Sequence, residues 1–316
     1  MQAPKFDLII PIVRKDLSLI LDNLKLLNHN IKAQNIIFIG EEDLTELFTG
    51  IPNVKFICEN NMIEGLTKKE IENIKTSITG DAKRSGWYFQ QFLKMGYSCI
   101  CENEYYLVWD SDTIPLKEID FFSSAAKPYL SFREYAKYDE CYSKTIEHLI
   151  QDNPIKKDSS KSFITEHMLI NASIMRKLIS DIEANISLAG NKFYEKIMHA
   201  VDPKYINLSG FSEFETYAAY ILKNFSNEYS LRHWNNLRCG KVFIGNKPTK
   251  EQLSWISTSF STVSIEKYDS HWIIFKVFNQ LKLDKLLSFH YVYITCIPII
   301  SVLYSLRLTL RAFIKR

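Results

Sequence analysis

Residues 105–116 have the sequence YYLVWDSDTIPL, in which an apolar run ends at two aspartates. The run Tyr105–Trp109 is typical of a strand buried on both faces, and Pro115 lies in the turn that follows. Ligands of open α/β sheets bind at the carboxyl ends of strands, where this pattern puts Asp110 and Asp112. Carboxylates spaced i, i+2 can face one Mg²⁺ or Mn²⁺, which completes its coordination with phosphate oxygens. The stretch predicts a metal-assisted phosphate site; the alternative is a polar turn with solvated carboxylates.

Asp152–Ser162 is the segment most typical of a flexible loop. On both sides of residues 105–116, short apolar runs alternate with helical patterns. This rhythm predicts an α/β fold with a mixed, mostly parallel sheet flanked by helices. We expect strands at Phe6–Val13, Asn35–Gly40, Val54–Cys58, Tyr129–Phe132 and Phe163–Ile170, and helices at Asp16–Leu27, within Thr67–Asp81, and at Gly86–Met95, Ala172–Ala184, Lys192–Ala200 and Glu213–Asn224.

The composition excludes several classes of protein. Of 316 residues, 46% are hydrophobic and 24% charged, which is typical of a folded protein and not of a disordered, collagenous or polytopic membrane chain. A net charge of +3 argues against a dedicated nucleic-acid binder. The glycine-rich dinucleotide and P-loop motifs are missing from the sequence. The N-terminus does not match a signal peptide, so we expect a cytoplasmic domain, and Cys99 and Cys101 fit reduced core thiols better than a zinc site.

The end of the chain has a different character. Residues Phe289–Leu306 include no Lys, Arg, Asp or Glu, and Pro298 interrupts them. Arg307, Arg311 and Lys315 follow at helical spacing, so on a helix they form one basic stripe. This combination is typical of an interfacial helix on anionic lipid. A buried C-terminal helix and a membrane span are the alternatives.

Four blocks of sequence carry a resemblance to a known family. YLVWDSDTIPL resembles the DxD strand end of GT-A-fold (Rossmann-related) glycosyltransferases that use nucleotide-sugar donors. GWYFQQFLKMGYS at residues 86–98 is similar to the helix before that motif in bacterial enzymes of surface polysaccharide and lipopolysaccharide assembly. TEHM at 165–168 and GFSEFETY at 210–217 add to the resemblance. It implies a GT-A-like catalytic domain over residues 1–270, and the composition of the end of the chain predicts a helical, apolar and basic membrane-associating segment over 271–316.

The resemblance also implies a cofactor and a donor site. Mn²⁺ or Mg²⁺ would be held by Asp112, with Asp110 on the metal or the ribose, and would neutralise the diphosphate leaving group. His271 is the preferred further metal ligand and His233 the alternative. The side chains of Glu166 and His167 are candidates for contact with the donor sugar or the acceptor. Donor contacts are expected from Pro11, Val13, Arg14, Arg84, Trp87, Gln91, Asp110 and Ser111, although Trp87 also fits a core position.

An inverting transfer needs a base that deprotonates the acceptor hydroxyl, and the GFSEFETY block supplies two acids. Glu213 is the preferred base and Glu215 the second choice. Ser212 is predicted to cap a helix, and acids are also favoured in a first helical turn for structural reasons alone. The implied enzyme transfers a sugar to a lipid-linked, lipopolysaccharide or capsule glycan acceptor, peripherally at the cytoplasmic face of the bacterial inner membrane, without a nucleic-acid partner.

Two other functions stay open at this point. A sugar-phosphate nucleotidyltransferase also uses metal-binding carboxylates, but it needs a glycine-rich phosphate loop after the first strand. Residues 12–18, IVRKDLS, contain no glycine. A membrane-bound scaffold that retains the fold without chemistry is the other alternative, and the intact Asp110 and Asp112 argue against it.

Overall fold

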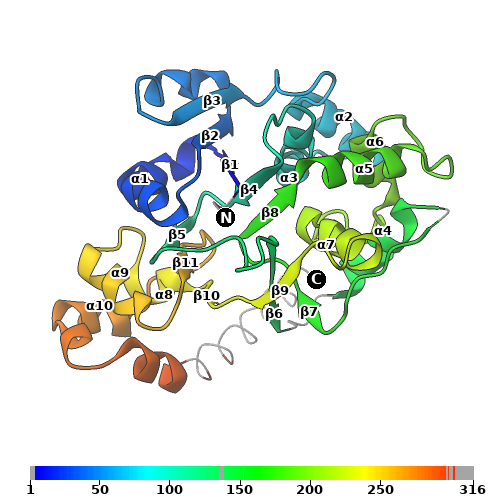
Figure 1. The fold of residues 1–316 in the computed structure, drawn as a ribbon. Coiled ribbons are helices and arrows are strands. Elements are labelled where there is room, and N and C mark those ends of the chain that lie inside the picture. Colours follow the sequence, from blue (N-terminus) through cyan, green and yellow to red (C-terminus); the bar gives the residue numbers. More distant parts are fainter. Residues whose placement is uncertain (1–3, 135–138, 152, 297, 299–301, 303–316) are drawn as a thin grey trace. The chain divides into compact units, whose positions relative to one another are not determined.

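The computed structural model describes residues 4–134, 139–151, 153–296, 298 and 302 (Figure 1). The chain divides into two compact units. The first comprises residues 1–111 and 119–234, and the second comprises 112–118 and 235–316. The predicted boundary between residues 270 and 271 stays a prediction.

A five-stranded sheet forms the centre of the first unit, with the strand order β3-β2-β1-β4-β8 (Figure 1). Its first four strands run parallel and β8 runs antiparallel to β4. The predicted mixed, mostly parallel sheet is therefore confirmed. The strands are β1 (Phe6–Pro11), β2 (Asn35–Gly40), β3 (Val54–Cys58), β4 (Tyr105–Trp109) and β8 (His167–Asn171).

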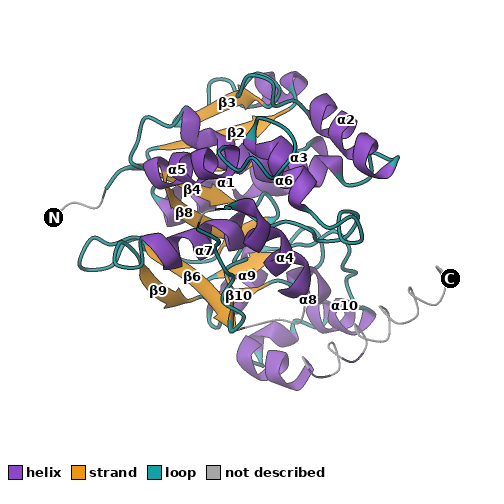
Figure 2. Ribbon diagram, turned by 90° about the vertical axis from the view of Figure 1, so that its right-hand side faces the viewer, coloured by secondary structure: helices purple, strands orange, loops and turns teal. Residues whose placement is uncertain are grey.

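Both faces of this sheet are buried, which explains why its strands are almost continuously apolar. Leu8 and Ile10 belong to one core with residues of α1 (Leu17–Ile31), whereas Ile9 belongs to a larger core on the other face. Helices flank both faces, as Figure 2 shows. Those of the larger core are α2 (Lys68–Thr79), α3 (Ser85–Gly96), α4 (Asp139–Leu149), α5 (Ala172–Glu183), α6 (Phe193–Ala200) and α7 (Glu213–Asn224).

Most predicted elements are present, and the differences have local causes. Helix α1 continues past the predicted end at Leu27 to Ile31, which is buried, and stops at Lys32 in the left-handed conformation. Strand β1 ends at Pro11 instead of Val13. The strand predicted to start at Phe163 starts at His167, because Glu166 has φ = 62°, which no strand residue adopts.

Smaller elements complete the first unit. A second sheet has the order β7-β6-β9. Its strands are β6 (Tyr129–Glu134), β7 (Lys161–Ser162) and β9 (Ser230–His233), and short 3₁₀ helices cover η1 (Arg14–Asp16), η2 (Glu42–Leu47) and η3 (Tyr97–Cys99).

The second unit contains a three-stranded sheet in the order β10-β11-β5. Among the residues described, no helix is both long and apolar enough to cross a membrane. Arg307, Arg311 and Lys315 lie outside the described residues. The elements of this unit are β5 (Thr113–Pro115), β10 (Asn236–Leu237), β11 (Thr262–Ser264), α8 (Gly240–Ile244), α9 (Lys250–Ser257), α10 (Ile273–Gln280) and η4 (Leu283–Lys285), followed by helical residues 289–296.

Candidate active site

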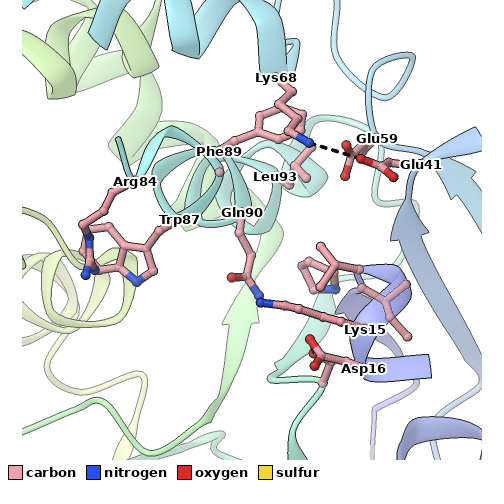
Figure 3. Close-up of a pocket in the computed structure, with 15 residues that line it drawn as sticks. Lys15, Asp16, Glu41, Glu59, Lys68, Arg84, Trp87, Phe89, Gln90 and Leu93 are labelled. Carbon is pink, nitrogen blue, oxygen red and sulfur yellow. Dashed lines mark hydrogen bonds and ion pairs between the residues drawn. The ribbon is translucent and has the colours of Figure 1, made fainter. Parts of the chain in front are cut away.

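A cavity of about 390 Å³ lies in the first unit, at the carboxyl ends of β1, β2 and β3 and beside α3 (Figure 3). This is the sheet edge where the sequence predicts a ligand. Two of the eight predicted donor residues are engaged elsewhere: Arg14 pairs with Asp43, and Gln91 Oε1 accepts a hydrogen bond from the Glu213 amide at 3.1 Å. Five predicted donor residues line the cavity: Pro11, Val13, Arg84, Trp87 and Ser111.

One wall of the cavity is a cation stacked on an aromatic ring. The Arg84 guanidinium lies 4.4 Å from the centre of the Trp87 ring (Figure 3). Arg84 caps α3 with a left-handed backbone, φ = 65°. Burial lowers the pKa of its guanidinium from the ordinary value, which nevertheless leaves it charged. A flat surface next to a fixed positive charge suits an aromatic base or a phosphate.

The opposite wall is formed by acids that the sequence analysis missed. Glu41 and Glu59 line the cavity, and Lys68 Nζ lies 3.1 Å from Glu41 Oε1 (Figure 3). Glu59 is only 6% exposed. Burial raises the pKa of its carboxyl to about 7; Glu41 acts in the same direction and Lys68 opposes it. Each acid directly follows β2 or β3, so the strand-end rule that selected Asp110 would also have found both of them.

A buried lysine that the sequence analysis also did not select connects two predicted site residues. Lys94 Nζ on α3 donates hydrogen bonds to Asp110 Oδ1 at 2.7 Å and to Glu213 Oε1 at 2.8 Å. It also lies 4.7 Å from the centre of the Phe214 ring. Burial acts to lower the pKa of Lys94, but the two carboxylates raise it above the ordinary value. Burial raises the pKa of Glu213, and Lys94 opposes that shift. We call Asp110, Lys94 and Glu213 the Lys94 triad; Lys94 and Glu213 are buried and Asp110 is partly exposed.

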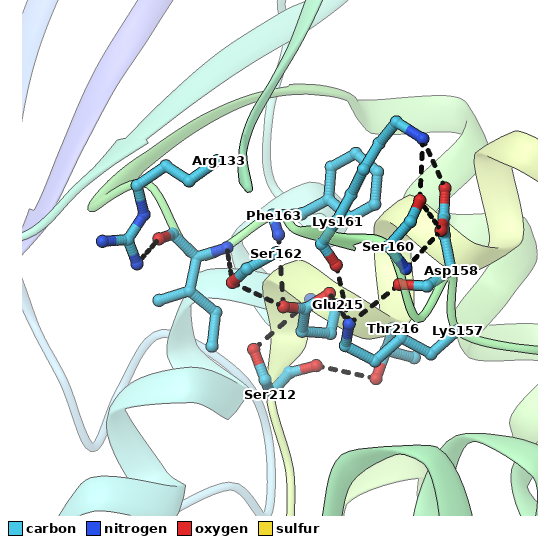
Figure 4. Close-up of polar contacts among 11 residues, drawn as sticks. Arg133, Lys157, Asp158, Ser160, Lys161, Ser162, Phe163, Ser212, Glu215 and Thr216 are labelled. Atoms are coloured by element: carbon cyan, nitrogen blue, oxygen red, sulfur yellow. Dashed lines mark hydrogen bonds and ion pairs between the residues drawn. The ribbon is translucent and has the colours of Figure 1, made fainter. Parts of the chain in front are cut away.

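Glu215, the second predicted base, holds a neighbouring segment in place (Figure 4). Its Oε1 accepts hydrogen bonds from Ser162 Oγ at 3.0 Å and from the Phe163 amide at 3.1 Å. Lys157 Nζ lies 3.5 Å from its Oε2, and both side chains are buried. Ser212 caps α7 as predicted, because its Oγ accepts from the Glu215 amide at 3.3 Å. Glu215 therefore anchors residues 157–163.

Glu166 directly precedes β8 and His167 is its first residue, and both are buried. The Glu166 carbonyl accepts a hydrogen bond from the Asp110 amide at 3.0 Å. His167 packs 4.4 Å from the Trp234 ring centre, and its Nδ1 lies 2.9 Å from the Thr165 carbonyl oxygen. Burial, and to a lesser extent Arg232, lowers the pKa of His167 to about 3, so its imidazole is neutral at physiological pH. Neither residue lines the cavity.

The two histidines predicted as metal ligands lie in different units. His233 is exposed on β9 and packs 5.7 Å from the Phe132 ring centre. His271 belongs to the second unit, and its buried Nε2 has no hydrogen-bond partner among the described residues. Burial lowers the pKa of His271. Within the described part of the chain, no three His, Cys, Asp or Glu side chains are grouped so as to hold a metal ion.

The DxD stretch crosses the junction between the units, because Ser111 ends a segment of the first and Asp112 begins the second. Asp112 is fixed by its neighbours: its carbonyl accepts from the Ile265 amide at 2.8 Å, and Thr113 Oγ1 donates to its Oδ1 at 3.4 Å. Each aspartate is therefore positioned by contacts within its own unit.

Several solved glycosyltransferase structures are similar to this chain. Mouse xyloside xylosyltransferase 1 in its apo form is 12% identical with a TM-score of 0.40, covering 83% of this chain and 98% of that one. WbbM, a bifunctional glycosyltransferase, is 10% identical with a TM-score of 0.43, covering 85% of this chain; the chain spans 47% of WbbM. An active-site mutant of LgtC is 10% identical with a TM-score of 0.40, covering 88% of this chain and 95% of that one. All three TM-scores lie below 0.5.

No curated protein matches the chain significantly. A family does: the model of a family of unknown function (DUF6492) matches residues 23–270. The match covers more than half of the sequence, and the chain belongs to that family.

Proposed function

We propose that the protein is a metal-dependent glycosyltransferase that moves a sugar from a nucleotide-sugar donor to a glycan acceptor. The observation that carries the proposal is the cavity at the carboxyl ends of β1–β3, which is lined by Ser111, the residue between the two aspartates. A volume of about 390 Å³ falls in the range of small-molecule sites. The cavity combines the stacked Arg84–Trp87 pair with the buried carboxyl of Glu59 and the partly exposed carboxyl of Glu41, and a nucleoside diphosphate presents phosphates, a flat base and N–H donors for such a set.

The residues present fit a divalent cation by their charge. The Lys94 triad carries two carboxylates and one ammonium, a net charge of −1. Asp110 Oδ2 makes no hydrogen bond with a described residue. Asp110 and Asp112 are the ligands proposed from the DxD pattern, and donor phosphate oxygens would complete the coordination of Mg²⁺ or Mn²⁺. When bound, the ion supplies charge neutralisation to the diphosphate leaving group.

Glu213 is the proposed general base of an inverting transfer. A base is most effective when its pKa lies near the working pH, and burial shifts the pKa of Glu213 upward. Lys94, at 2.8 Å, fixes the orientation of this carboxylate. Glu215 is less suited, because its carboxylate accepts the Ser162 and Phe163 hydrogen bonds that hold residues 157–163. The acceptor proposed is a lipid-linked or lipopolysaccharide or capsule glycan, and the proposed location is the cytoplasmic face of the bacterial inner membrane.

Ligand-induced stabilisation tests the proposal without knowledge of the acceptor. Ligands that bind the native state raise its melting temperature, so UDP, GDP and CMP and their sugars can be screened with and without Mn²⁺. We expect a Mn²⁺-dependent shift with one nucleotide. Asp112→Asn should abolish the Mn²⁺-dependent part, whereas the control Asp22→Asn, on the exposed side of α1, should keep it. No shift with any nucleotide, with or without metal, would contradict the proposal and favour a non-catalytic scaffold.

A further inference from the structure

The second unit exposes an apolar helix face. Ile273, Ile274, Val277 and Leu281 are 79%, 64%, 48% and 63% exposed. Successive residues of an α-helix are rotated by about 100°, so these four side chains lie within an arc of about 100° around the axis of α10. We call these four residues the α10 face. Such concentrations of exposed apolar side chains mark interaction sites, since large apolar patches are rare on soluble surfaces.

The α10 face belongs to an ordered part of the unit, because the opposite side of the helix is anchored. Phe275 is buried, with its ring 4.6 Å from that of Phe243. Asn279 Nδ2 donates to the Phe243 carbonyl at 2.9 Å, and Phe278 stacks on Trp255 with the ring centres 5.5 Å apart. The helix is therefore held by one side while its apolar outer side faces solvent.

The same arrangement continues after α10. In the helical residues 289–296, Phe289 and Val292 are buried, whereas Tyr291 and Ile294 are 57% and 50% exposed. Leu286, in the connection between the helices, is 77% exposed. The apolar surface thus extends along the chain beyond a single helix.

The exposed charged side chains of residues 273–286 are lysines, and the sequence that follows is also basic. Lys276, Lys282 and Lys285 are exposed. After Asp284 the sequence contains five basic residues, Lys285, Arg307, Arg311, Lys315 and Arg316, and no Asp or Glu. A bilayer containing anionic lipid complements this combination: its hydrocarbon boundary takes the aliphatic side chains and its headgroups take the lysines.

We propose that the α10 face, with Lys276 and Lys282 beside it, is a docking surface for an anionic phospholipid bilayer. A protein partner is the less favoured occupant, because cores of protein–protein interfaces are depleted in lysine and enriched in aromatic residues and methionine, whereas this face is aliphatic and flanked by lysine. Helix α10 has eight residues, far fewer than the about 20 that a membrane span needs, so the contact proposed for its face is one with the membrane surface. The inference rests on the membrane location given in the proposed function and names the surface that makes the contact; because docking needs neither a donor nor turnover, vesicle binding and nucleotide binding can fail separately.

Vesicle flotation of the full chain tests the docking surface. Wild type should float with vesicles of mixed phosphatidylglycerol and phosphatidylcholine and remain unbound with phosphatidylcholine alone. Ile273→Glu with Ile274→Glu should lower the partition coefficient by about tenfold or more. Lys276→Gln and Lys282→Gln should each lower it by about fivefold at low ionic strength, because a lysine near the surface contributes a factor of that size.

The matched control is Ile186→Glu with Leu208→Glu, two exposed apolar residues of the first unit, 88% and 57% exposed. It adds the same charge and should float like wild type. Ile273→Ser with Ile274→Ser removes apolar surface without added charge, and should also weaken flotation. Circular dichroism and melting temperature establish that each variant is folded.

Four outcomes would overturn the inference. The first is no flotation of wild type with either kind of vesicle, and the second is equal flotation with both. The third is flotation of the double variant Ile273→Glu with Ile274→Glu at the wild-type level. The fourth is a concentration-dependent dimer in solution that the double variant abolishes while vesicle binding is absent, which would assign the α10 face to a second copy of the chain.

Discussion

Lys94 Nζ lies 2.8 Å from Glu213 Oε1, although the two residues are 119 positions apart in the chain. The contact joins the interior of α3 to the first turn of α7, and both side chains are about 5% exposed. Removing charges from water at such a site is costly, and the attraction offsets the cost only when the geometry is good. The second carboxylate, Asp110 at 2.7 Å, supplies a further partner for the ammonium.

Replacing Lys94 by methionine should therefore be strongly destabilising. The variant leaves the buried Glu213 carboxylate and the partly exposed Asp110 carboxylate without their cation, and breaking a buried pair from one side typically costs about 3–5 kcal/mol. Urea denaturation measures the loss in the free energy of unfolding. Lys177→Met is the control: Lys177 pairs with Asp181 at 3.3 Å on an exposed helix surface, where the expected loss is below about 0.5 kcal/mol. Equal losses for the two variants would contradict this prediction.

We expect the two acids in the first turn of α7 to have different roles, Glu213 in catalysis and Glu215 in stability. Glu213→Gln should lower the transfer rate by about 10²- to 10⁴-fold, as for loss of a general base, and leave nucleotide binding intact. Glu215→Gln weakens the acceptor of the Ser162 and Phe163 hydrogen bonds and leaves Lys157 without its carboxylate.

For Glu215→Gln we expect a loss of about 1–3 kcal/mol in unfolding free energy, with transfer retained by the folded fraction. Steady-state rates and urea denaturation, measured on both variants, make the comparison. If Glu213→Gln kept full turnover while Glu215→Gln lost it, the two roles would be reversed.

Glu59 should make the stability of the protein depend on pH. The pKa of its carboxyl is about 7 in the folded state and about 4.5 when unfolded, so between these values the folded state holds the proton more tightly. This contribution to stability is present below about pH 4.5 and is lost as the pH rises through about 7.

Glu59→Gln keeps a neutral group at all pH values. The variant should therefore be more stable than wild type above about pH 8, and the difference in stability between the two proteins should become small at low pH. Up to about 1.4 kcal/mol should accrue for each pH unit in which only the folded state is protonated. Melting temperatures of both proteins from about pH 5 to 9 give the comparison. A constant difference across this range would show that Glu59 does not titrate there.

Gly240 should tolerate no side chain. A Cβ at this position would lie 2.1 Å from Val263 Cγ2 and 2.9 Å from the Ser264 carbonyl oxygen. Gly240→Ala should therefore cost about 1–3 kcal/mol through overpacking, read from the thermal unfolding of the full chain. Gly86 offers the matched control, because its Cβ would meet nothing within 4 Å and alanine is the better helix former in α3. A destabilising Gly86→Ala would contradict the reasoning.

The sequence predicted the sheet well because its strands are buried on both faces, and such strands are visible as apolar runs. The predicted Asn35–Gly40, Val54–Cys58 and Tyr105–Trp109 have the bounds of β2, β3 and β4. The strand expected from Phe163 failed at Glu166, since a left-handed backbone at a glutamate has no signature in a hydrophobic pattern.

The candidate site was predicted only in part. Residues near the DxD stretch could be selected by their position at a strand end, and five of the expected donor residues line one cavity. Lys94 could not be selected in that way, because its partners Asp110 and Glu213 become neighbours only through the packing of α3 against β4 and α7. Pairing between distant positions is set by tertiary structure, which local sequence patterns do not describe.

Arg84 gives the protein engineer a choice between stability and recognition. Its backbone is left-handed, φ = 65°, a conformation that costs a residue with a side chain about 1–2 kcal/mol and costs glycine almost nothing. A screen for thermostable variants would therefore select Arg84→Gly. That variant would also remove the cation stacked 4.4 Å from Trp87, so a more heat-resistant protein obtained in this way would lack the positive charge of the proposed donor site.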